Sequence, residues 1–302
     1  MRPEALSPAP EVAPFAAWAA ERQRRIEAVL ERVLTPAPGV PTELTDAMRY
    51  ATLGGGKRMR PLLAYAAGEL AQAASDAVDG VAAAVEMIHA YSLVHDDLPC
   101  MDNDVLRRGK PTCHVKYGEA MALLAGDALQ AQAFAALQST RLADPAEACR
   151  LLAHAAGARG MAGGQAIDLL HVGKAMALPA LEGMHRMKTG ALIRAAILLG
   201  AQCGRAAQGA EAALATFSRS IGLAFQVVDD ILDVEGSAAA LGKTAGKDAA
   251  QNKPTYVSLL GLAEARRHAA ALHEEALAAL APFGARGRRL CEIADWIVQR
   301  DH

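Results

Sequence analysis

Aromatic residues are scarce in this sequence of 302 residues, in which Phe, Trp and Tyr together make up only 4%. Because β-sheets draw on aromatic and β-branched side chains, whereas the abundant Ala and Leu favour helices, the composition predicts a helical protein. An excess of charge of either sign is also missing, since the formal net charge is -2. Without an overall basic field, binding to nucleic acid or to an anionic membrane is not expected. Any anion site must therefore be built locally.

Cysteines are few and none forms a Cys-x-x-Cys pair; they are Cys100, Cys113, Cys149, Cys203 and Cys291. An odd number without paired spacing argues against a disulfide framework or a zinc site and indicates a reducing, cytoplasmic environment. The start of the chain, Met1–Trp18, is broken by prolines and lacks the charged start and apolar stretch of a signal peptide. The nearest candidate for a membrane span, 81–98, contains Glu86, two histidines and two aspartates, so we expect no span.

Helical periodicity begins at about Ala16 and continues toward the end of the chain. We expect residues 1–15 to be a mobile lead-in and residues 16–302 to form a single all-α domain, a helical bundle around a central active-site cavity. The sequence shows neither the period-two alternation of strands nor repeats of solenoid length. The expected helical segments are residues 62–74, 78–98, 115–139, 145–170, 179–202, 210–234, 255–281 and 287–299.

The first acidic cluster, residues 96–104, ends a long apolar segment and contains Asp96, Asp97 and Asp102. Pro99 is expected to end or kink the preceding helix, which lets Asp102 return toward Asp96. Oxygen-only clusters of this kind suit hard cations, and magnesium in particular binds a few carboxylates together with substrate phosphates.

The second acidic cluster, residues 229–233, contains Asp229, Asp230 and Asp233 and ends another apolar run. Residues four apart on a helix lie about 40° apart around its axis, so Asp229 and Asp233 share a face. Carboxylates at the end of a buried helix are costly unless something positive meets them. Taken alone, either cluster is also typical of a solvated helix end. Together they imply metal ions held between two walls of one cavity.

Basic residues lie beside the acidic clusters and beside a glycine loop. The loop 53–56 leads into Lys57 and Arg60, which are three residues apart and able to meet one anion at a helix start. Arg107 and Arg108 follow the first acidic cluster, and arginine matches phosphate oxygens in bidentate pairs. Each group also has a simpler interpretation, as a solvated loop or as neutralisation of nearby aspartates.

Further polar residues accompany these groups. Lys188 and Thr189 lie early in a helical segment, where the threonine can cap the helix or line a cavity. Lys243 and Lys253 follow the second acidic cluster, and a charged surface loop is the competing explanation for them. His89 stands two helical turns before the first acidic cluster on roughly the same face, which leaves both ligand binding and a structural role open.

Five motifs follow one another along the chain: Leu53-Gly-Gly-Gly-Lys-Arg-Met-Arg-Pro61, the first acidic cluster with Leu106-Arg-Arg-Gly109, Lys188-Thr189-Gly190, Phe225-Gln-Val-Val-Asp-Asp-Ile-Leu-Asp233 and Gly242-Lys-Thr-Ala-Gly-Lys-Asp248. In this order they resemble the signature of the trans-isoprenyl diphosphate synthase family, over roughly Leu44 to the C-terminus. Four residues separate the paired and final aspartates of the first cluster, which is similar to the spacing in bacterial farnesyl diphosphate synthases. One departure is Asn103, where close relatives often have aspartate.

The resemblance implies the isoprenoid-synthase bundle, a homodimer and several Mg²⁺ ions per active site, with Mn²⁺ able to substitute. It further implies condensation of isopentenyl diphosphate with dimethylallyl and then geranyl diphosphate. The allylic diphosphate ionises, the homoallylic double bond attacks the cation, and a proton is then lost to the departing diphosphate. The implied metal residues are Asp96, Asp97, Asp102, Asp229, Asp230 and Asp233.

The resemblance also implies roles for the other polar residues. Those matching the isopentenyl diphosphate site are Lys57, Arg60, His89 and Arg108. Those matching the allylic diphosphate site are Arg107, Lys188, Lys243 and Lys253. Those implied to place oxygens near the developing cation, or to orient them, are Thr189, Gln226, Gln165 and Asp168. The implied catalytic residues among all of these are Lys188, Thr189, Gln226 and Arg107.

Product length is expected to depend on Tyr91 and Ser92, which precede Asp96 by roughly 6–8 Å along the helix axis. In the resemblance, a tyrosine at this position limits the product to (2E,6E)-farnesyl diphosphate, and ordinary core packing is the alternative. Synthesis of geranyl or geranylgeranyl diphosphate by the same chemistry remains open. A terpene cyclase, a head-to-head synthase or a noncatalytic synthase subunit agrees less well with two intact acidic clusters.

Overall fold

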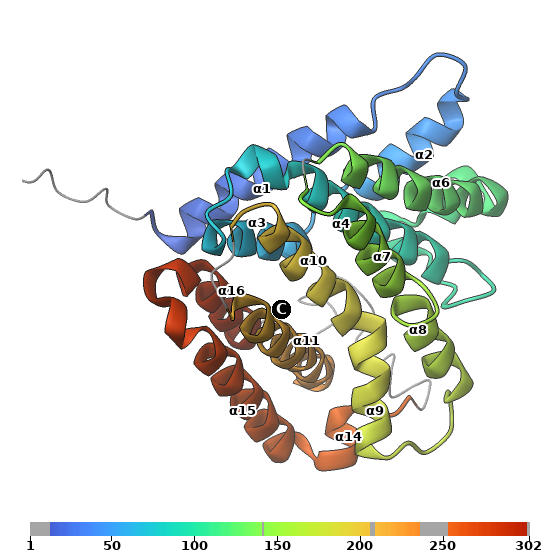
Figure 1. Ribbon diagram of the computed structural model, residues 1–302. Coiled ribbons are helices and arrows are strands. Elements are labelled where there is room, and N and C mark those ends of the chain that lie inside the picture. The colour runs from blue at the N-terminus through green and yellow to red at the C-terminus, as the bar shows by residue number, and fades with distance from the viewer. Residues whose placement is uncertain (1–12, 141, 206–208, 236–252, 301–302) are drawn as a thin grey trace, which may run out of the picture.

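The computed structural model describes residues 13–140, 142–205, 209–235 and 253–300, and Figure 1 shows them as a bundle of helices. The α-helices are α1 (Phe15–Val33), α2 (Thr42–Thr52), α3 (Met59–Leu70), α4 (Ser75–Asp96), α5 (Cys113–Tyr117), α6 (Glu119–Gln138), α7 (Pro145–Ala156), α8 (Met161–Leu170), α9 (Leu178–His185), α10 (Ala191–Gln202), α11 (Ala210–Glu235), α14 (Tyr256–Leu260), α15 (Leu262–Leu280) and α16 (Arg288–Gln299). A π-helix, η1 (Arg186–Gly190), joins α9 to α10, and a 3₁₀ helix, η2 (Ala281–Gly287), joins α15 to α16. The expected all-α fold is confirmed.

Three of the expected helical segments are divided in the structure. Segment 115–139 is interrupted between α5 and α6 at Gly118, whose φ is 85°. Segment 145–170 is interrupted between α7 and α8, where the chain turns between Gly157 and Gly160. Segment 255–281 is interrupted between α14 and α15 by Gly261, whose φ of 77° lies in the left-handed region that glycine adopts most easily. Helical periodicity alone did not reveal these breaks, because the apolar pattern continues across them.

A short hairpin is the only strand structure in the described part of the chain. Strands β1 (Leu106–Arg107) and β2 (Lys110–Pro111) pair antiparallel. The two turn residues, Arg108 and Gly109, both have positive φ, 53° and 73°, as a two-residue turn matched to strand twist requires. The hairpin holds the two arginines that follow the first acidic cluster.

Helix α4 runs through the core and ends at the first acidic cluster. It packs against α1, α3, α6 and α10, and most of its side chains are buried on every face. A helix surrounded by other helices must be apolar all round, which explains the long hydrophobic segment in the sequence. The second acidic cluster lies on α11, which is also largely buried. Each of the two acidic clusters predicted to bind magnesium is therefore positioned by a buried helix.

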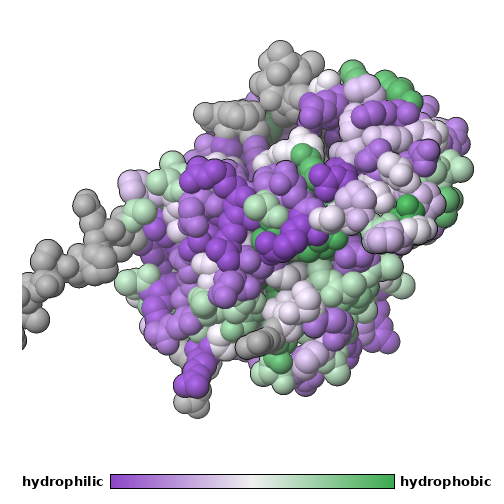
Figure 2. All heavy atoms as spheres, turned by 90° about the horizontal axis from the view of Figure 1, so that it is seen from above, coloured by the Kyte–Doolittle hydropathy of each residue, from purple (hydrophilic) through white to green (hydrophobic). Residues whose placement is uncertain are grey.

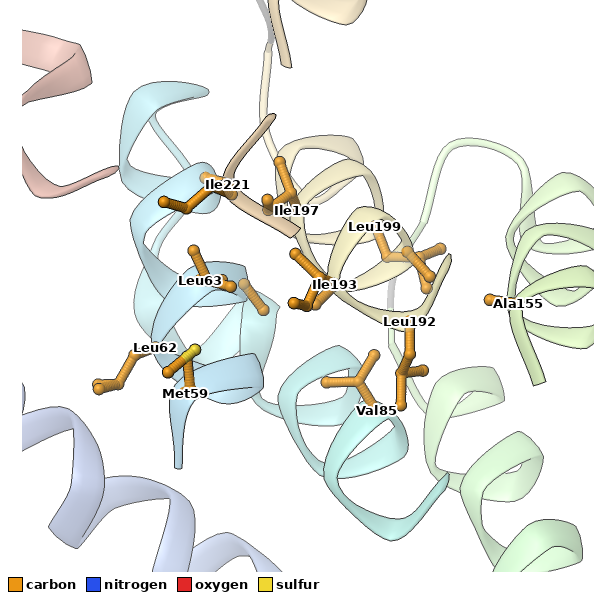
Figure 3. Packing of buried hydrophobic residues seen from close by; sticks show 14 of the residues in the cluster. Met59, Leu62, Leu63, Val85, Ala155, Leu192, Ile193, Ile197, Leu199 and Ile221 are labelled. Atoms are coloured by element: carbon orange, nitrogen blue, oxygen red, sulfur yellow. The ribbon is translucent and has the colours of Figure 1, made fainter. Parts of the chain in front are cut away.

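The core forms where α3, α4, α10 and α11 meet. Figure 3 shows buried hydrophobic side chains from these four helices, most of them gathered around Ile193, with Ala155 contributed by α7. The labelled core residues from the four helices are Met59, Leu62, Leu63, Val85, Leu192, Ile193, Ile197, Leu199 and Ile221. This packing fixes α4 and α11 relative to each other and thereby positions the two acidic clusters.

Two helices, α4 and α6, are long and apolar enough to cross a membrane by length and composition alone. In α4, 67% of the most apolar window is buried inside the fold, so packing accounts for its composition. In α6 the corresponding share is 39%, and Leu123 and Leu124 are 47% and 51% exposed. Sequence reasoning considered only the segment that became α4 and overlooked α6.

Candidate active site

The end of α4 turns the first acidic cluster back on itself. The helix ends at Asp96, three residues before Pro99, and the backbone N–H of Asp102 donates to the carbonyl of Asp96 at 2.8 Å. Asn103 has a φ of 51°, in the left-handed region that asparagine tolerates well, and its N–H donates to the carbonyl of Leu98. The expected return of Asp102 toward Asp96 is confirmed, and Asn103 suits the turn.

One cavity of about 390 Å³ brings together residues from α3, α4, α8 and η1. At its polar end it is lined by a carboxylate, cations and hydrogen-bonding groups, and farther along by Tyr91, Met161 and Leu169. The charged, histidine, amide and aliphatic hydroxyl residues that line it are Arg60, His89, Ser92, His95, Asp96, Gln165, Lys188 and Thr189. Both nitrogen and oxygen of the Gln165 amide are buried and have no hydrogen-bond partner among the residues that the structure describes. An unpaired buried amide facing a cavity is a group that a polar ligand can satisfy.

The charge on Asp96 is costly without a ligand. Burial raises the pKa of its carboxyl to about 6, with Lys188 opposing this shift and Asp102 adding to it. A carboxylate held in this way gains from a cation that compensates for its lost solvation.

A network of ion pairs connects the first acidic cluster to the later part of the chain. Lys188 Nζ lies 2.6 Å from Asp168 Oδ2, and Lys253 Nζ lies 3.8 Å from the same oxygen. Lys253 Nζ is also 3.6 Å from Asp102 Oδ1. Burial acts to raise the pKa of Asp168, but the two lysines outweigh it and hold that pKa below its usual value. Asp168 therefore places two cations opposite the first acidic cluster.

Backbone packing sets the position of Lys188. A Cβ on Gly164 of α8 would lie 2.2 Å from the backbone nitrogen of Lys188, so α8 and η1 touch directly. Because π-helical turns carry one extra residue, they re-aim the side chains that follow, and they are frequent at functional sites. Both Lys188 and Thr189 come from this turn.

A chain of hydrogen bonds fixes the direction of one amide. Gln226 Nε2 donates to Asp230 Oδ1 at 3.1 Å, while Gln226 Oε1 accepts from Thr189 Oγ1 at 3.3 Å. The other oxygen of Asp230 accepts from the backbone N–H of Tyr256 at 2.8 Å. Since its NH₂ group faces the carboxylate, Gln226 presents its carbonyl oxygen beside Thr189. Asp230 thus orients this pair of oxygens as well as belonging to the second acidic cluster.

The hairpin arginines are held in different ways. Arg107 donates from Nε and Nη2 to the carboxylate of Asp97, with the shortest N–O distance 2.6 Å, and Asp97 is only 3% exposed. Its Nη1 group has no partner among the described residues. Arg108 donates to the carbonyl of Gly55, and its guanidinium lies so close to Gly56 that a Cβ there would be 2.6 Å away. The hairpin and the glycine loop are therefore joined.

Burial, together with the cations beside the glycine loop, keeps His89 neutral. Burial, reinforced by the positive charges of Arg60 and Arg108, lowers the pKa of His89 well below its usual value. Burial also lowers the pKa of Arg60, whose Nε has no hydrogen-bond partner in the described structure. A neutral imidazole beside a buried, underpartnered guanidinium forms a site suited to an anion that accepts hydrogen bonds.

Two arginines that sequence reasoning did not single out also shape the site. Arg58 is 4% exposed and donates to Glu86 at 2.6 Å, to Glu27 at 2.7 Å and to the carbonyl of Thr52 at 2.7 Å. Arg58 is the N-cap residue of α3, with a φ of 50°. Its buried side chain therefore anchors the backbone where the glycine loop meets α3. The available signal was the run of three basic residues at 57–60, which does not reveal which one turns inward.

The second missed residue, Arg300, follows α16 and meets the second acidic cluster. Its Nη2 lies 2.5 Å from Asp229 Oδ1 and 2.8 Å from the carbonyl oxygen of Phe225, and its guanidinium lies 4.0 Å from the centre of the Phe225 ring. The negative charge of Asp229 also acts to raise the pKa values of Lys57 and Arg60, against the larger lowering effect of burial. This places the second acidic cluster next to the cations of the glycine loop. Lys243 lies outside the described residues.

The carboxylates suit magnesium in type but are not assembled into a complete ligand set. Within the described ranges, no group of three or more His, Cys, Asp or Glu residues is arranged to hold a metal. Magnesium usually takes one or two carboxylates and fills its remaining positions with water and substrate phosphate. The oxygen donors of Asp96 and Asp102, drawn together by the turn after α4, fit that mode of binding.

Tyr91 forms part of the cavity wall. It is 7% exposed, its ring meets that of His95 edge-on at 5.7 Å, and its hydroxyl lies 3.5 Å from the carbonyl oxygen of Ala156. Ser92 lines the same cavity and donates to the carbonyl of His89. Tyr91 therefore faces the cavity from the same helix as Asp96, as well as packing against α7.

Comparisons with known proteins agree with this geometry. Residues 41–281 match the family model described as Polyprenyl synthetase. The chain is 53% identical to a probable farnesyl diphosphate synthase of Bradyrhizobium diazoefficiens, over 91% of this chain and 85% of that protein. It is 50% identical to the farnesyl diphosphate synthase of Escherichia coli, over 90% of this chain and 94% of that protein.

A solved structure is also similar over nearly the whole chain. The geranyltransferase of Helicobacter pylori, complexed with magnesium and isoprenyl diphosphate, superposes with a TM-score of 0.82 at 33% identity. The superposition covers 96% of this chain and 98% of that one. The family model spans well over half of the sequence, and the matched residues 41–281 include both acidic clusters. This chain belongs to the polyprenyl synthetase family.

Proposed function

We propose that this protein is a magnesium-dependent prenyltransferase that condenses isopentenyl diphosphate with dimethylallyl diphosphate and then with geranyl diphosphate to give (2E,6E)-farnesyl diphosphate. The observation that carries the proposal is the single cavity on which Asp96, Lys188 and Tyr91 converge. It combines a polar end suited to metal and diphosphate with a wall suited to an apolar chain. The names of the relatives at 50–53% identity support the same reaction.

The allylic diphosphate is held between cations of the two halves of the bundle. In this proposal Lys188 and Lys253, placed by Asp168, meet its oxygens, and Arg107 adds the Nη1 group that Asp97 leaves available. Magnesium, with Asp96, Asp97 and Asp102 on one side and the aspartates 229, 230 and 233 on the other, supplies charge that stabilises the leaving diphosphate. Several Mg²⁺ ions, with Mn²⁺ as a substitute, are part of the proposal.

The allylic cation forms beside fixed oxygens and away from water. Thr189 lines the cavity and its hydroxyl is held by Gln226 Oε1, so fixed oxygen atoms beside the cavity favour positive charge there without any rearrangement at the moment of reaction. Isopentenyl diphosphate lies against Lys57, Arg60 and neutral His89, together with Arg108 of the hairpin. Its double bond attacks the cation, and the departing diphosphate accepts the proton that is lost.

We further propose a cytoplasmic homodimer that uses α6 as part of its interface. Helix α6 is the less buried of the two long apolar helices, and Leu123 and Leu124 expose about half of their surface. Exposed apolar area on one helix is typical of a surface covered by a partner. The five cysteines are all free thiols, as a reducing compartment favours.

The proposed reaction is tested by incubating purified protein with isopentenyl and dimethylallyl diphosphates, with magnesium or with excess EDTA, and identifying the products after dephosphorylation. We expect mainly farnesol, and only with magnesium. Geraniol or geranylgeraniol as the main product selects one of the alternative synthases. Absence of condensation with magnesium, in protein with a native helical spectrum, contradicts the proposal.

A further inference from the structure

A basic groove lies outside the active-site cavity. It has a volume of about 510 Å³ and is formed by α7, by η1 with α10, and by α11. Its lining contains no aspartate or glutamate. The cationic residues of this basic groove are Arg150, Arg159, Arg186, Arg194 and Arg219, with His154 beside them.

Helical spacing directs these residues to one place. Arg150 and His154 are four residues apart on α7, while Arg186 of η1 and Arg194 of α10 both line the groove from a second segment. On α11, Arg219 lies four residues after Ala215, which also lines the groove. Side chains four apart share a helix face, as Arg150 and His154 do, and each of the three segments contributes at least one arginine to the groove. The floor between them is apolar and buried, and it includes Leu151 and Ala155.

The positive charge of the groove is only partly balanced. Three of its arginines form ion pairs with glutamates outside the lining: Arg150 with Glu147, Arg186 with Glu182, and Arg219 with Glu275. Arg159 and Arg194 have no carboxylate partner among the described residues, and both are exposed. Like charges gathered in one concavity repel one another and concentrate anions there. This arrangement stands out in a chain whose net charge is -2.

We propose that the basic groove is a second anion site, which binds an oligophosphate and communicates with the active site through η1. Guanidinium groups pair with phosphate oxygens through two parallel hydrogen bonds, and five of them suit an anion with several phosphate groups better than a single carboxylate. A volume of about 510 Å³ lies within the range of small-molecule sites. The apolar floor accommodates the organic part of a phosphate ester.

The link to the active site is the π-helix η1. Its residues Arg186 and Gly190 line the basic groove, while Lys188 and Thr189, between them, line the active-site cavity. An anion that draws Arg186 into the groove acts on the same five-residue turn that aims Lys188 at Asp168. Two sites that share one short element are coupled whenever a ligand favours one arrangement of that element.

Binding of inorganic triphosphate, measured by calorimetry with EDTA present, tests the site directly. The variant Arg159→Gln/Arg194→Gln removes the two arginines without carboxylate partners and leaves every active-site residue in place. We expect about a tenfold weaker Kd, and about threefold for each single variant, because exposed arginine–phosphate pairs contribute modestly. The control Arg24→Gln/Arg286→Gln makes the same charge change at exposed positions elsewhere and should bind as the wild type does.

Equal affinity of the wild type, the groove variant and the control overturns the proposal. Circular dichroism establishes that the variants fold, and the single variants serve if the double variant does not. Coupling is read separately, as slower hydrogen exchange in residues 186–190 when triphosphate is added to the wild type but not to the groove variant. Exchange unchanged in both removes the link through η1. Neither readout depends on turnover, so failure here leaves the proposed prenyl transfer untouched.

Discussion

Lys188 Nζ and Asp168 Oδ2 lie 2.6 Å apart, and this contact joins η1 to α8 at the wall of the active-site cavity. Asp168→Asn removes the charge that holds Lys188 and Lys253 together, so the two lysines repel each other and turn away from the allylic diphosphate. We expect KM for dimethylallyl diphosphate to rise about tenfold, the equivalent of about 1.4 kcal/mol, with a smaller change in kcat. Steady-state kinetics measures both, and Asp168→Glu should recover part of the loss.

Asp229 is expected to be essential for turnover but not for folding. It lies near the end of α11, half-exposed and facing Arg300, so Asp229→Ala removes a metal oxygen without opening the core. Condensation should fall by at least about a hundredfold, since metal-stabilised charge on the leaving group is lost. The matched control is Glu211→Ala, an exposed carboxylate at the start of the same helix. Comparable activity in the two variants contradicts the metal role of Asp229.

Replacement of Tyr91 tests the cavity wall. Tyr91→Ala removes the ring that faces the cavity, so the growing chain has room for further isoprene units, and we expect products longer than farnesyl diphosphate. Tyr91→Phe keeps the ring and loses only the hydroxyl, whose contact with Ala156 is long at 3.5 Å. It should keep the wild-type product. Chromatography of the dephosphorylated products distinguishes these outcomes, and an unchanged product length in Tyr91→Ala means that Tyr91 only packs the core.

The buried pair of Arg58 and Glu86 is expected to stabilise the fold beneath the glycine loop. Glu86→Ala leaves the Arg58 guanidinium buried with Glu27 as its remaining carboxylate. Breaking a buried ion pair in this way costs about 3–5 kcal/mol of unfolding free energy. Urea denaturation measures the loss. Glu86→Gln, which keeps a hydrogen-bond acceptor at the same place, should lose less, and a Glu86→Gln variant as stable as the wild type would show that the charge of Glu86 contributes nothing.

His185 is expected to make stability sensitive to acid. Burial, followed by the charge of Lys188, lowers the pKa of His185 to about 4, and its ring stacks on Tyr256. His185 therefore binds a proton near pH 6.5 in the unfolded chain but only near pH 4 in the folded chain. Stability from this group is complete above pH 6.5 and is lost as the pH falls toward 4, by about 2 kcal/mol at pH 5. His185→Phe should reduce the difference in unfolding free energy between pH 7 and pH 5; an unreduced difference assigns the effect to other groups.

Much of the site could be predicted because its residues are close in sequence or on one helix. Pro99 ends α4, and Asp102 folds back to Asp96 within six residues, which local backbone rules anticipate. His89 and Asp96 were expected on one face of a helix, and both line the cavity. The roles inferred for the individual site residues stay predictions, as does the division into a lead-in of residues 1–15 and a domain of residues 16–302. Helix α1 begins at Phe15, and residues 1–12 lie outside the described part of the chain.

The rest could not be predicted because it depends on partners distant in the sequence. Arg58 meets Glu86 across 28 residues, and Arg300 meets Asp229 across 71. No local pattern marks which member of a basic run turns inward, because that choice follows from a buried carboxylate on another helix. The basic groove was missed for the same reason, since its arginines come from three helices and form no motif along the chain.

Because α4 is one continuous helix, it fixes the distance between residues along its axis. Asp96 ends this helix and Tyr91 stands five residues earlier, so the metal end and the wall are separated by a fixed rise of roughly 7.5 Å along one rod. No loop lies between Tyr91 and Asp96, so the distance between them cannot change by loop movement. Deleting a residue between them would rotate Tyr91 away from the cavity. Under the proposed function, exchanging side chains at successive turns of α4 should therefore change product length in steps set by the helical pitch.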